Sequence, residues 1–141
     1  MISGNKLKHS IGVARACRQY GKDIHADEEY CDALFVMGFL HDIGYEKSPD
    51  ISQPSVGGSM IEAFLKHPEM LEAIKYHGKK FENLSKVDTI LNTADLTVSY
   101  NGKPCTAWER LEGIKKCYGE DSDHYKNARL LADTLGFNEE L

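Results

Sequence analysis

The chain has 141 residues, which is about the size of one domain, and its 41% hydrophobic and 28% charged residues are typical of a folded globular protein. The formal net charge is −5, from 17 Lys and Arg against 22 Asp and Glu, and the basic residues are scattered, so we do not expect a long nucleic acid as partner. The longest apolar run, residues 33–40, is far shorter than the roughly 18 residues of a membrane span, so we expect a cytoplasmic protein without contact to a membrane.

Hydrophobic residues recur at helical spacing throughout the chain, and no stretch shows the sustained alternation of a β-strand. This periodicity predicts an all-α fold, a compact single-domain bundle of about six to seven helices over residues 1–141. The helices are expected at residues 5–20, 27–42, 54–65, 68–77, 85–99, 107–118 and 122–135.

The first predicted helix carries a histidine on its inward side. Leu7 and Ile11 mark one apolar face of this helix. At 100° per residue, His9 shares a second side with Val13, away from the polar stripe to which Lys8 belongs. We therefore expect His9 to face the interior.

The second predicted helix is apolar on every side over residues 33–40, so we expect it to be the central and most buried helix. It ends in His41 and Asp42, and Gly44 then supplies a helix stop. A carboxylate at the carboxyl end of a buried helix is disfavoured by the helix dipole and by desolvation, which costs several kcal/mol unless a cation compensates. A bound metal is the simplest such cation.

Polar residues 46–53 are expected to form a loop, and the fourth helix, opened by Pro68, ends at His77 before Gly78. Two roles are open for His77: an interaction with the end of its own helix, or a place in the pocket. Lys79 and Lys80 follow this helix stop, where surface charge is the commoner role.

The fifth predicted helix keeps an apolar stripe, and Asp95 falls at its edge beside Leu91. A second carboxylate is thus expected near the core. The last two helices are ordinary amphipathic elements that we expect to cover the domain, with Trp108 anchoring their packing.

Imidazole and carboxylate groups together suit borderline divalent metals, so the histidines and aspartates at the helix edges and ends form a candidate metal site. Hydrogen bonding at helix ends is the alternative role for the two carboxylates. The expected cofactor is one divalent metal ion, with Mn, Fe, Co, Ni, Zn and Mg all open. The predicted ligands are His9, His41, Asp42 and Asp95.

Three short motifs carry a resemblance to a known family. His9 lies in K-H-S, and the pair His41 and Asp42 lies in F-L-H-D-I-G-Y. Asp95 lies in T-A-D-L. In this order and spacing, residues 5–100 resemble the HD superfamily of metal-dependent phosphohydrolases. The resemblance implies a helical HD-type domain with its metal site in the core, to which residues 101–141 add C-terminal helices. It also implies hydrolysis of a phosphate ester or anhydride of a small phosphorylated molecule, with nucleotides as the leading class.

The chain departs from the family pattern at two positions. Members with two metals usually have a histidine in a segment like H-P-x-x-G-A, where this chain reads Q-P-S-V-G-G with Gln53. Gln53 is a poor ligand, so we expect a single metal. The family often reads H-D-I-G-K, and Tyr45 stands in place of that phosphate-binding lysine. The candidate substrate-binding residues are therefore Lys47, His77, Lys79 and Lys80.

In the implied reaction, the metal polarises a phosphoryl oxygen and lowers the pKa of a water towards about 7. Asp42 is the expected catalytic aspartate, and Glu46 and Asp50 are candidates for positioning the water. Two other functions stay open: a non-catalytic HD module that senses a metal or nucleotide, and a di-iron HD-type oxygenase, which needs two metals. A homodimer is an open alternative to a monomer.

Overall fold

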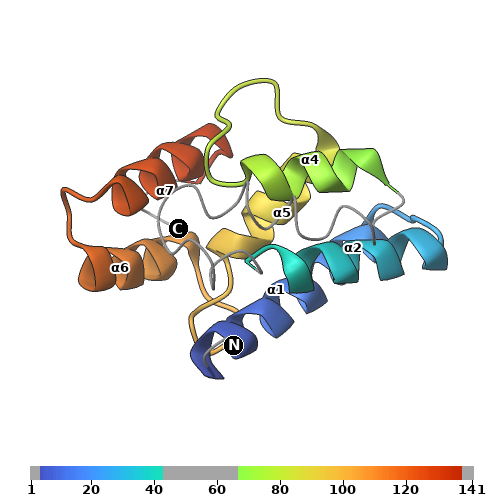
Figure 1. The fold of residues 1–141 in the computed structure, drawn as a ribbon, viewed down its shortest axis with the longest axis horizontal. Coiled ribbons are helices and arrows are strands. Elements are labelled where there is room, and N and C mark those ends of the chain that lie inside the picture. The colour runs from blue at the N-terminus through green and yellow to red at the C-terminus, as the bar shows by residue number, and fades with distance from the viewer. Residues whose placement is uncertain (1–3, 43–66, 138–141) are drawn as a thin grey trace.

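The computed structural model of the chain describes residues 4–42 and 67–137. These residues form helices without any strand, which confirms the predicted all-α fold (Figure 1). The expected helix 54–65 lies outside the described residues. None of the described helices is both long and apolar enough to cross a membrane. The helices are α1 (Gly4–Asp23), α2 (Glu28–Leu40), α4 (Pro68–Tyr76), α5 (Lys86–Leu96), α6 (Ala107–Tyr118) and α7 (Asp123–Thr134).

Side-chain caps fix where most of these helices begin. At the start of α2, the Asp27 carboxylate accepts a hydrogen bond of 2.8 Å from the Tyr30 amide. Ser85 caps α5 and forms a capping box with Asp88, and Thr106 caps α6 in the same way. Such caps satisfy amide groups that the first helical turn leaves without a partner. The starts of these helices therefore agree with the predicted ones to within one residue.

The end of the fifth helix differs from the prediction, because α5 ends at Leu96 rather than near residue 99. Thr97 leaves the helical conformation, and its carbonyl oxygen accepts a hydrogen bond of 2.9 Å from the Cys105 amide. The Ser99 amide donates to the Lys103 carbonyl oxygen, also at 2.9 Å. Residues 97–105 thus fold back as a tight turn, the 97–105 turn.

Glycines allow the 97–105 turn to pack directly against α1. Gly102 has a φ of +81°, a left-handed conformation that glycine adopts without steric cost. A Cβ atom at Gly102 would clash with the carbonyl oxygen of Lys8 in α1. A Cβ atom at Gly12 of α1 would in turn lie 2.6 Å from the carbonyl oxygen of Gly102. This close contact places Ser99 of the turn beside His9.

The main hydrophobic core lies between α1, α2, α4 and α5 (Figure 1). Among the described helices α5 is the most buried, because it contacts α1, α2, α4, α6 and α7 and buries seven of its 11 residues. The prediction that the second helix is the most buried one is therefore wrong for this part of the chain. Val36 of α2 is 37% exposed, and Leu7, expected on an apolar face of α1, is 41% exposed.

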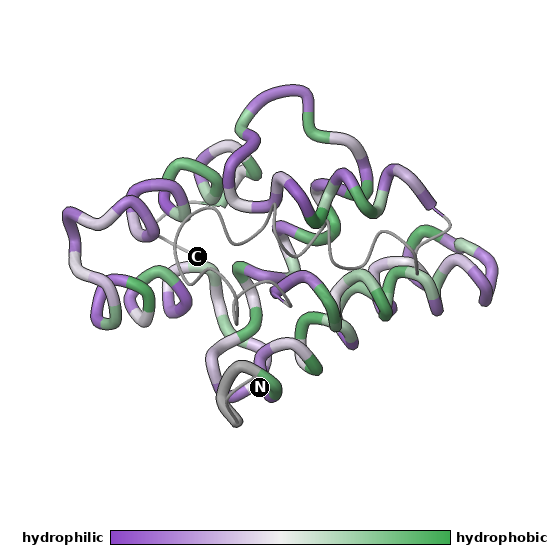
Figure 2. The backbone as a smooth tube through the Cα atoms, viewed as in Figure 1, coloured by the Kyte–Doolittle hydropathy of each residue, from purple (hydrophilic) through white to green (hydrophobic). Residues whose placement is uncertain are grey.

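Helices α1 and α2 lie side by side, and hydrophobic residues recur along both of them (Figure 2). They come close together at Gly38 of α2, where a Cβ atom would lie 2.8 Å from the Cα atom of Ala14. Only a glycine allows the two backbones to come this close. The contact holds the carboxyl end of α2, which carries His41 and Asp42, against α1.

The last two helices do not simply cover the main core. They form a second hydrophobic cluster around Leu96, at the carboxyl end of α5. Trp108 packs against this cluster, as predicted. Helix α6 also contacts α5 directly, which brings the amino-terminal half of α6 close to Asp95. The other buried members of the second cluster are Leu111, Leu131 and Ala132.

Candidate metal centre

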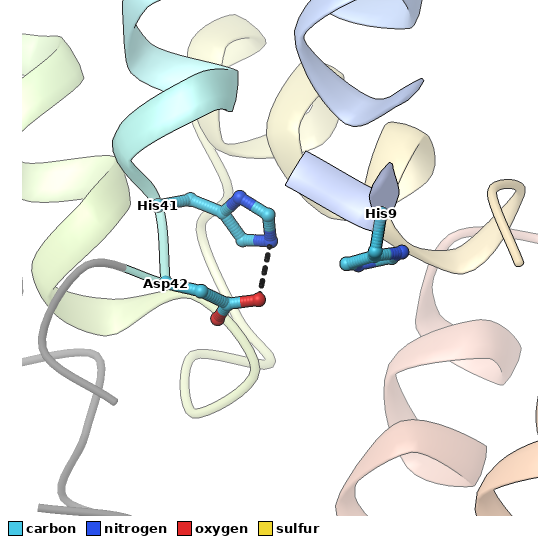
Figure 3. Close-up of side chains that lie close together, drawn as sticks. All are labelled: His9, His41 and Asp42. Atoms are coloured by element: carbon cyan, nitrogen blue, oxygen red, sulfur yellow. Dashed lines mark ion pairs between the residues drawn. The ribbon is translucent and has the colours of Figure 1, made fainter. Parts of the chain in front are cut away.

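Five side chains from four helices, or from residues directly after them, lie close together, and we name them the histidine–aspartate cluster. They are His9 of α1, His41 and Asp42 at the end of α2, His77 directly after α4, and Asp95 of α5. The ligand atoms of His9, His41 and Asp42 lie within 4.8 Å of one another, and so do those of His41, His77 and Asp95. Figure 3 shows His9 opposite the pair formed by His41 and Asp42.

The contacts inside the cluster join an imidazole Nε2 atom to a carboxylate oxygen in every case. His9 Nε2 lies 2.8 Å from Asp95 Oδ1, and His41 Nε2 lies 3.3 Å from the same oxygen. His41 Nε2 is also 3.1 Å from Asp42 Oδ2, the contact dashed in Figure 3. His77 Nε2 lies 3.5 Å from Asp42 Oδ1. Each carboxylate therefore bridges two imidazole rings.

The opposite nitrogen of each ring, Nδ1, is held by the main chain. A carbonyl oxygen can only accept a hydrogen bond, so each Nδ1 must carry a proton that it donates. In the neutral ring the Nε2 atom then presents a lone pair to the cluster, the tautomer found in metal-binding histidines whose other nitrogen is anchored. The Nδ1 acceptors are the carbonyl oxygens of Ser99 for His9 (3.0 Å), Gly38 for His41 (2.6 Å) and Ile74 for His77 (2.8 Å).

Neutral rings in this tautomer would direct lone pairs at negatively charged carboxylate oxygens, which is a repulsive arrangement. Either protons on Nε2 or a cation between the groups removes this repulsion. Nitrogen and oxygen donors of this kind suit a borderline divalent ion such as Mn, Fe, Co or Zn. The donors thus fit a divalent metal in either of two overlapping groups, His9 with His41 and Asp42, or His41 with His77 and Asp95.

The charges in the cluster shift the pKa values of three members. Burial alone would favour neutral His41, but attraction and hydrogen bonding from Asp42 and Asp95 raise its pKa well above the ordinary value. Burial alone would raise the pKa of Asp42, but His41 and His77 lower it well below the ordinary value. For Asp95, burial is likewise outweighed by hydrogen bonds from His41 and His9, and its pKa is also well below the ordinary value. Both carboxylates are therefore ionised at neutral pH.

The cluster is closed on its histidine side and open on its carboxylate side. The side chains of His9, His41 and His77 are 4%, 0% and 6% exposed. Those of Asp42 and Asp95 are 19% and 25% exposed. A metal site that is open on one side leaves room for water or substrate beside the ion, which is typical of catalytic rather than structural sites.

In the comparison with known protein families, the model of the HD domain matches residues 7–99, a range that contains all five residues of the cluster. The chain belongs to the HD family. Among curated proteins and among solved structures no match was found. The family assignment agrees with the resemblance seen in the sequence motifs, and HD domains typically bind a divalent metal.

All four predicted ligands of this HD domain, His9, His41, Asp42 and Asp95, lie together in the cluster. That they bind a metal stays a prediction. The sequence left two roles open for His77, and the structure supports both at once. Its Nδ1 atom is bonded to the end of α4, while its Nε2 atom faces Asp42. His77 is therefore a further candidate ligand, and its role in substrate binding stays a prediction.

Of the lysines predicted to bind substrate, the structure describes Lys79 and Lys80. Lys80 Nζ lies 3.2 Å from Asp88 Oδ2 at the start of α5, which favours its role as a surface charge. The Lys79 amide donates to the Tyr76 carbonyl oxygen in the turn after α4. The remaining predicted residues, namely Gly44, Tyr45, Glu46, Lys47, Asp50 and Gln53, lie outside the described part of the HD domain.

A buried asparagine supports the position of His77 in the HD domain. Asn92 of α5 accepts a hydrogen bond of 3.0 Å from the Gly78 amide through Oδ1, and its Nδ2 atom donates to the Asp88 carbonyl oxygen at 2.8 Å. The residue is 1% exposed. The turn that carries His77 is thus fixed to the same helix that carries Asp95.

Sequence reasoning missed one residue beside the cluster, Arg110 of α6. Its Nε atom donates to the Asp95 carbonyl oxygen at 3.1 Å, and its Nη2 atom lies 3.8 Å from Asp95 Oδ1. Arginine in the sequence W-E-R-L of an amphipathic helix is typical of a solvated face. In the structure, the side chain of Arg110 is only 10% exposed, and this burial distinguishes it from a surface charge.

Proposed function

We propose that the protein is a metal-dependent phosphohydrolase that hydrolyses a phosphate ester or anhydride of a small molecule, and that nucleotides are the substrate class to test first. Membership in the HD family supports the reaction type. The observation that carries the proposal is that three imidazole Nε2 atoms, each fixed by an Nδ1–H bond to a carbonyl oxygen, face two ionised carboxylates.

We infer that the cluster holds one ion. The two groups of ligand atoms overlap at His41, whose Nδ1 atom is committed to the Gly38 carbonyl oxygen and which therefore has only Nε2 to offer. One nitrogen atom supplies its lone pair to one metal, so within residues 4–42 and 67–137 the two groups cannot each hold an ion at the same time. A single ion argues against the di-iron oxygenase, which requires two.

When bound, the divalent ion supplies Lewis-acid polarisation of a phosphoryl oxygen and makes a coordinated water more acidic. The histidines would hold the ion from the more buried side of the cluster. Asp42 and Asp95 are its more exposed members, so the substrate would approach from their side. A carboxylate beside a divalent ion stays ionised at neutral pH, so Asp42 could accept a hydrogen bond from the attacking water and orient it. Glu46 and Asp50 stay the predicted candidates for assisting in that step.

The experiment that tests the proposal combines metal analysis with an activity screen. The protein is purified, its metals are determined by elemental analysis, and hydrolysis of a nucleotide and phosphate-ester panel is measured with Mn, Co, Ni, Mg, Zn and Fe. We expect one metal per chain and release of inorganic phosphate from at least one class. One bound metal without hydrolysis of any compound would instead support a non-catalytic sensing module. A ratio near two with oxygen uptake would support the oxygenase.

A further inference from the structure

Arg110 is held beside the histidine–aspartate cluster in an unusual way. Besides its Nε bond to the Asp95 main chain, its Nη2 atom lies 3.5 Å from His9 Nε2. The guanidinium carbon stands 4.7 Å from the centre of the Tyr100 ring, a cation–π distance. A main-chain carbonyl and an aromatic ring thus fix the plane of the guanidinium group.

One nitrogen of this group is left unused. Arg110 Nη1 is buried and has no hydrogen-bond partner. A buried donor without a partner destabilises the fold, and a charged donor does so more strongly, so such an atom calls for an explanation. The pairing of Arg110 with Asp95 does not provide one, because that contact runs through Nη2 and is 3.8 Å long.

A second arginine shows that an unused nitrogen alone does not define a site. Arg18 Nε is also buried without a partner, but the side chain is 40% exposed and Arg18 Nη2 pairs with Asp32 at 3.1 Å. Arg18 lies nine residues after His9 on α1, about 14 Å further along the helix axis. Arg110 differs because it is 10% exposed and touches two members of the cluster.

We propose that the guanidinium group of Arg110 binds a phosphoryl oxygen of the substrate beside the histidine–aspartate cluster, an inference that rests on the proposed function. The planar guanidinium fork matches the geometry of a phosphate group, and its charge does not depend on pH. The ligand would lie between two positive groups, the divalent ion and Arg110.

The test uses inorganic phosphate as the probe and the Mn-loaded full chain as the protein. Phosphate binding is measured by calorimetry for the wild type, R110Q, R110K and the control R18Q. We expect R110Q to retain its metal and to bind phosphate about 10- to 100-fold more weakly, as follows from the loss of a charged hydrogen bond. R110K should recover part of the affinity, because lysine keeps the charge but not the fork. R18Q should bind phosphate as the wild type does.

Unchanged phosphate affinity in metal-loaded R110Q would overturn the proposal, even if the wild type hydrolyses phosphate esters. Loss of metal from both R110Q and R110K would also overturn it, because Arg110 would then act by positioning Asp95 and His9. Conversely, a wild type that binds phosphate through Arg110 but hydrolyses nothing would refute only the proposed function. If R110Q does not fold, ¹⁵N NMR of the Arg110 side chain in the Zn-loaded wild type decides: its Nε–H signal must shift when phosphate is added, and an unchanged signal refutes the proposal.

Discussion

Asp95 Oδ1 lies 2.8 Å from His9 Nε2, although the two residues are 86 positions apart in the chain. The same oxygen lies 3.3 Å from His41 Nε2. One carboxylate oxygen therefore connects three helices, α1, α5 and the end of α2. Removal of the negative charge of Asp95 should therefore affect both His9 and His41.

We expect D95N to lose its metal. The substitution keeps the size of the side chain but removes the negative charge that offsets the ion, and an amide is a weaker ligand than a carboxylate. D42A should lose the metal for the same reason. Metal content after dialysis and gel filtration, determined by elemental analysis, checks both variants. H124A is the control, since His124 stacks on Tyr118 at a ring distance of 4.1 Å in another part of the domain. Full metal occupancy in D95N or D42A would refute the ligand assignment.

His77 offers a sharper comparison, because α4 has a histidine at each end. We expect H77A to bind Mn or Zn at least about tenfold more weakly, as even residues that only support a metal ligand typically cost that much. H67A should leave the affinity unchanged: His67 precedes α4 and lies 3.1 Å from Glu29 at the surface. Competition with a chelator indicator measures both affinities. Equal affinities in H77A and the wild type would leave His77 with only its role at the end of α4.

The pKa shifts predict how the stability of the metal-free protein depends on pH. The folded pKa of His41 is raised, so its contribution is fully present below the unfolded pKa of about 6.5 and is lost as the pH rises through the folded value. The folded pKa values of Asp42 and Asp95 are lowered, so their contributions are present above about pH 3.9 and are lost as the pH falls through the folded values. These three groups therefore favour stability between about pH 4 and 6.5.

Urea unfolding of the chelator-treated protein across pH 5 to 9 measures this dependence. We expect the free energy of unfolding to decrease above about pH 6.5 without metal and to decrease less with Zn, because the bound ion replaces the proton between His41 and the carboxylates. A metal-free protein that becomes more stable between pH 7 and 9 would contradict the arrangement of charges described above.

The sequence indicated most members of the histidine–aspartate cluster because they are tied to strong local signals, and metal binding itself stays a prediction. His41 and Asp42 end an apolar run, and His9 follows from helical periodicity, so both positions could be inferred from the chain alone. The convergence of Asp95 with them required the family motif, because periodicity places a residue on a helix but not beside another helix. The starts of α5 and α6 could also be predicted from the sequence, since Ser85 and Thr106 are typical capping residues.

The features that the sequence did not predict depend on contacts between elements. The end of α5 is set by the 97–105 turn, whose packing depends on Gly102 meeting α1. Arg110 looks like an ordinary surface residue until α6 is placed against the end of α5. The burial of α2 was overestimated for a related reason: a helix that is apolar all round still exposes Val36 when few neighbours surround it.

The last prediction concerns the contact that aligns α2 with α1. In G38A, the new Cβ atom would lie 2.8 Å from the Cα atom of Ala14 and 3.0 Å from the Val13 carbonyl oxygen. Both neighbours are backbone atoms, so the helices must separate, and overpacking of this kind costs about 1–3 kcal/mol of unfolding free energy. The Gly38 carbonyl oxygen also accepts the Nδ1–H bond of His41, so the metal affinity should fall together with the stability.

G113A is the matched control, and it should change stability in the opposite direction. Gly113 lies within α6 and has no atom within 4 Å of an added Cβ, so alanine gains helix propensity without a clash. We expect it to stabilise the protein by about 0.5–1 kcal/mol and to leave metal affinity unchanged. Urea unfolding and metal titration of both variants distinguish the two effects. If G38A is as stable as G113A and binds metal equally well, the close approach of α1 and α2 does not position His41, and the site must be held in place by its other contacts.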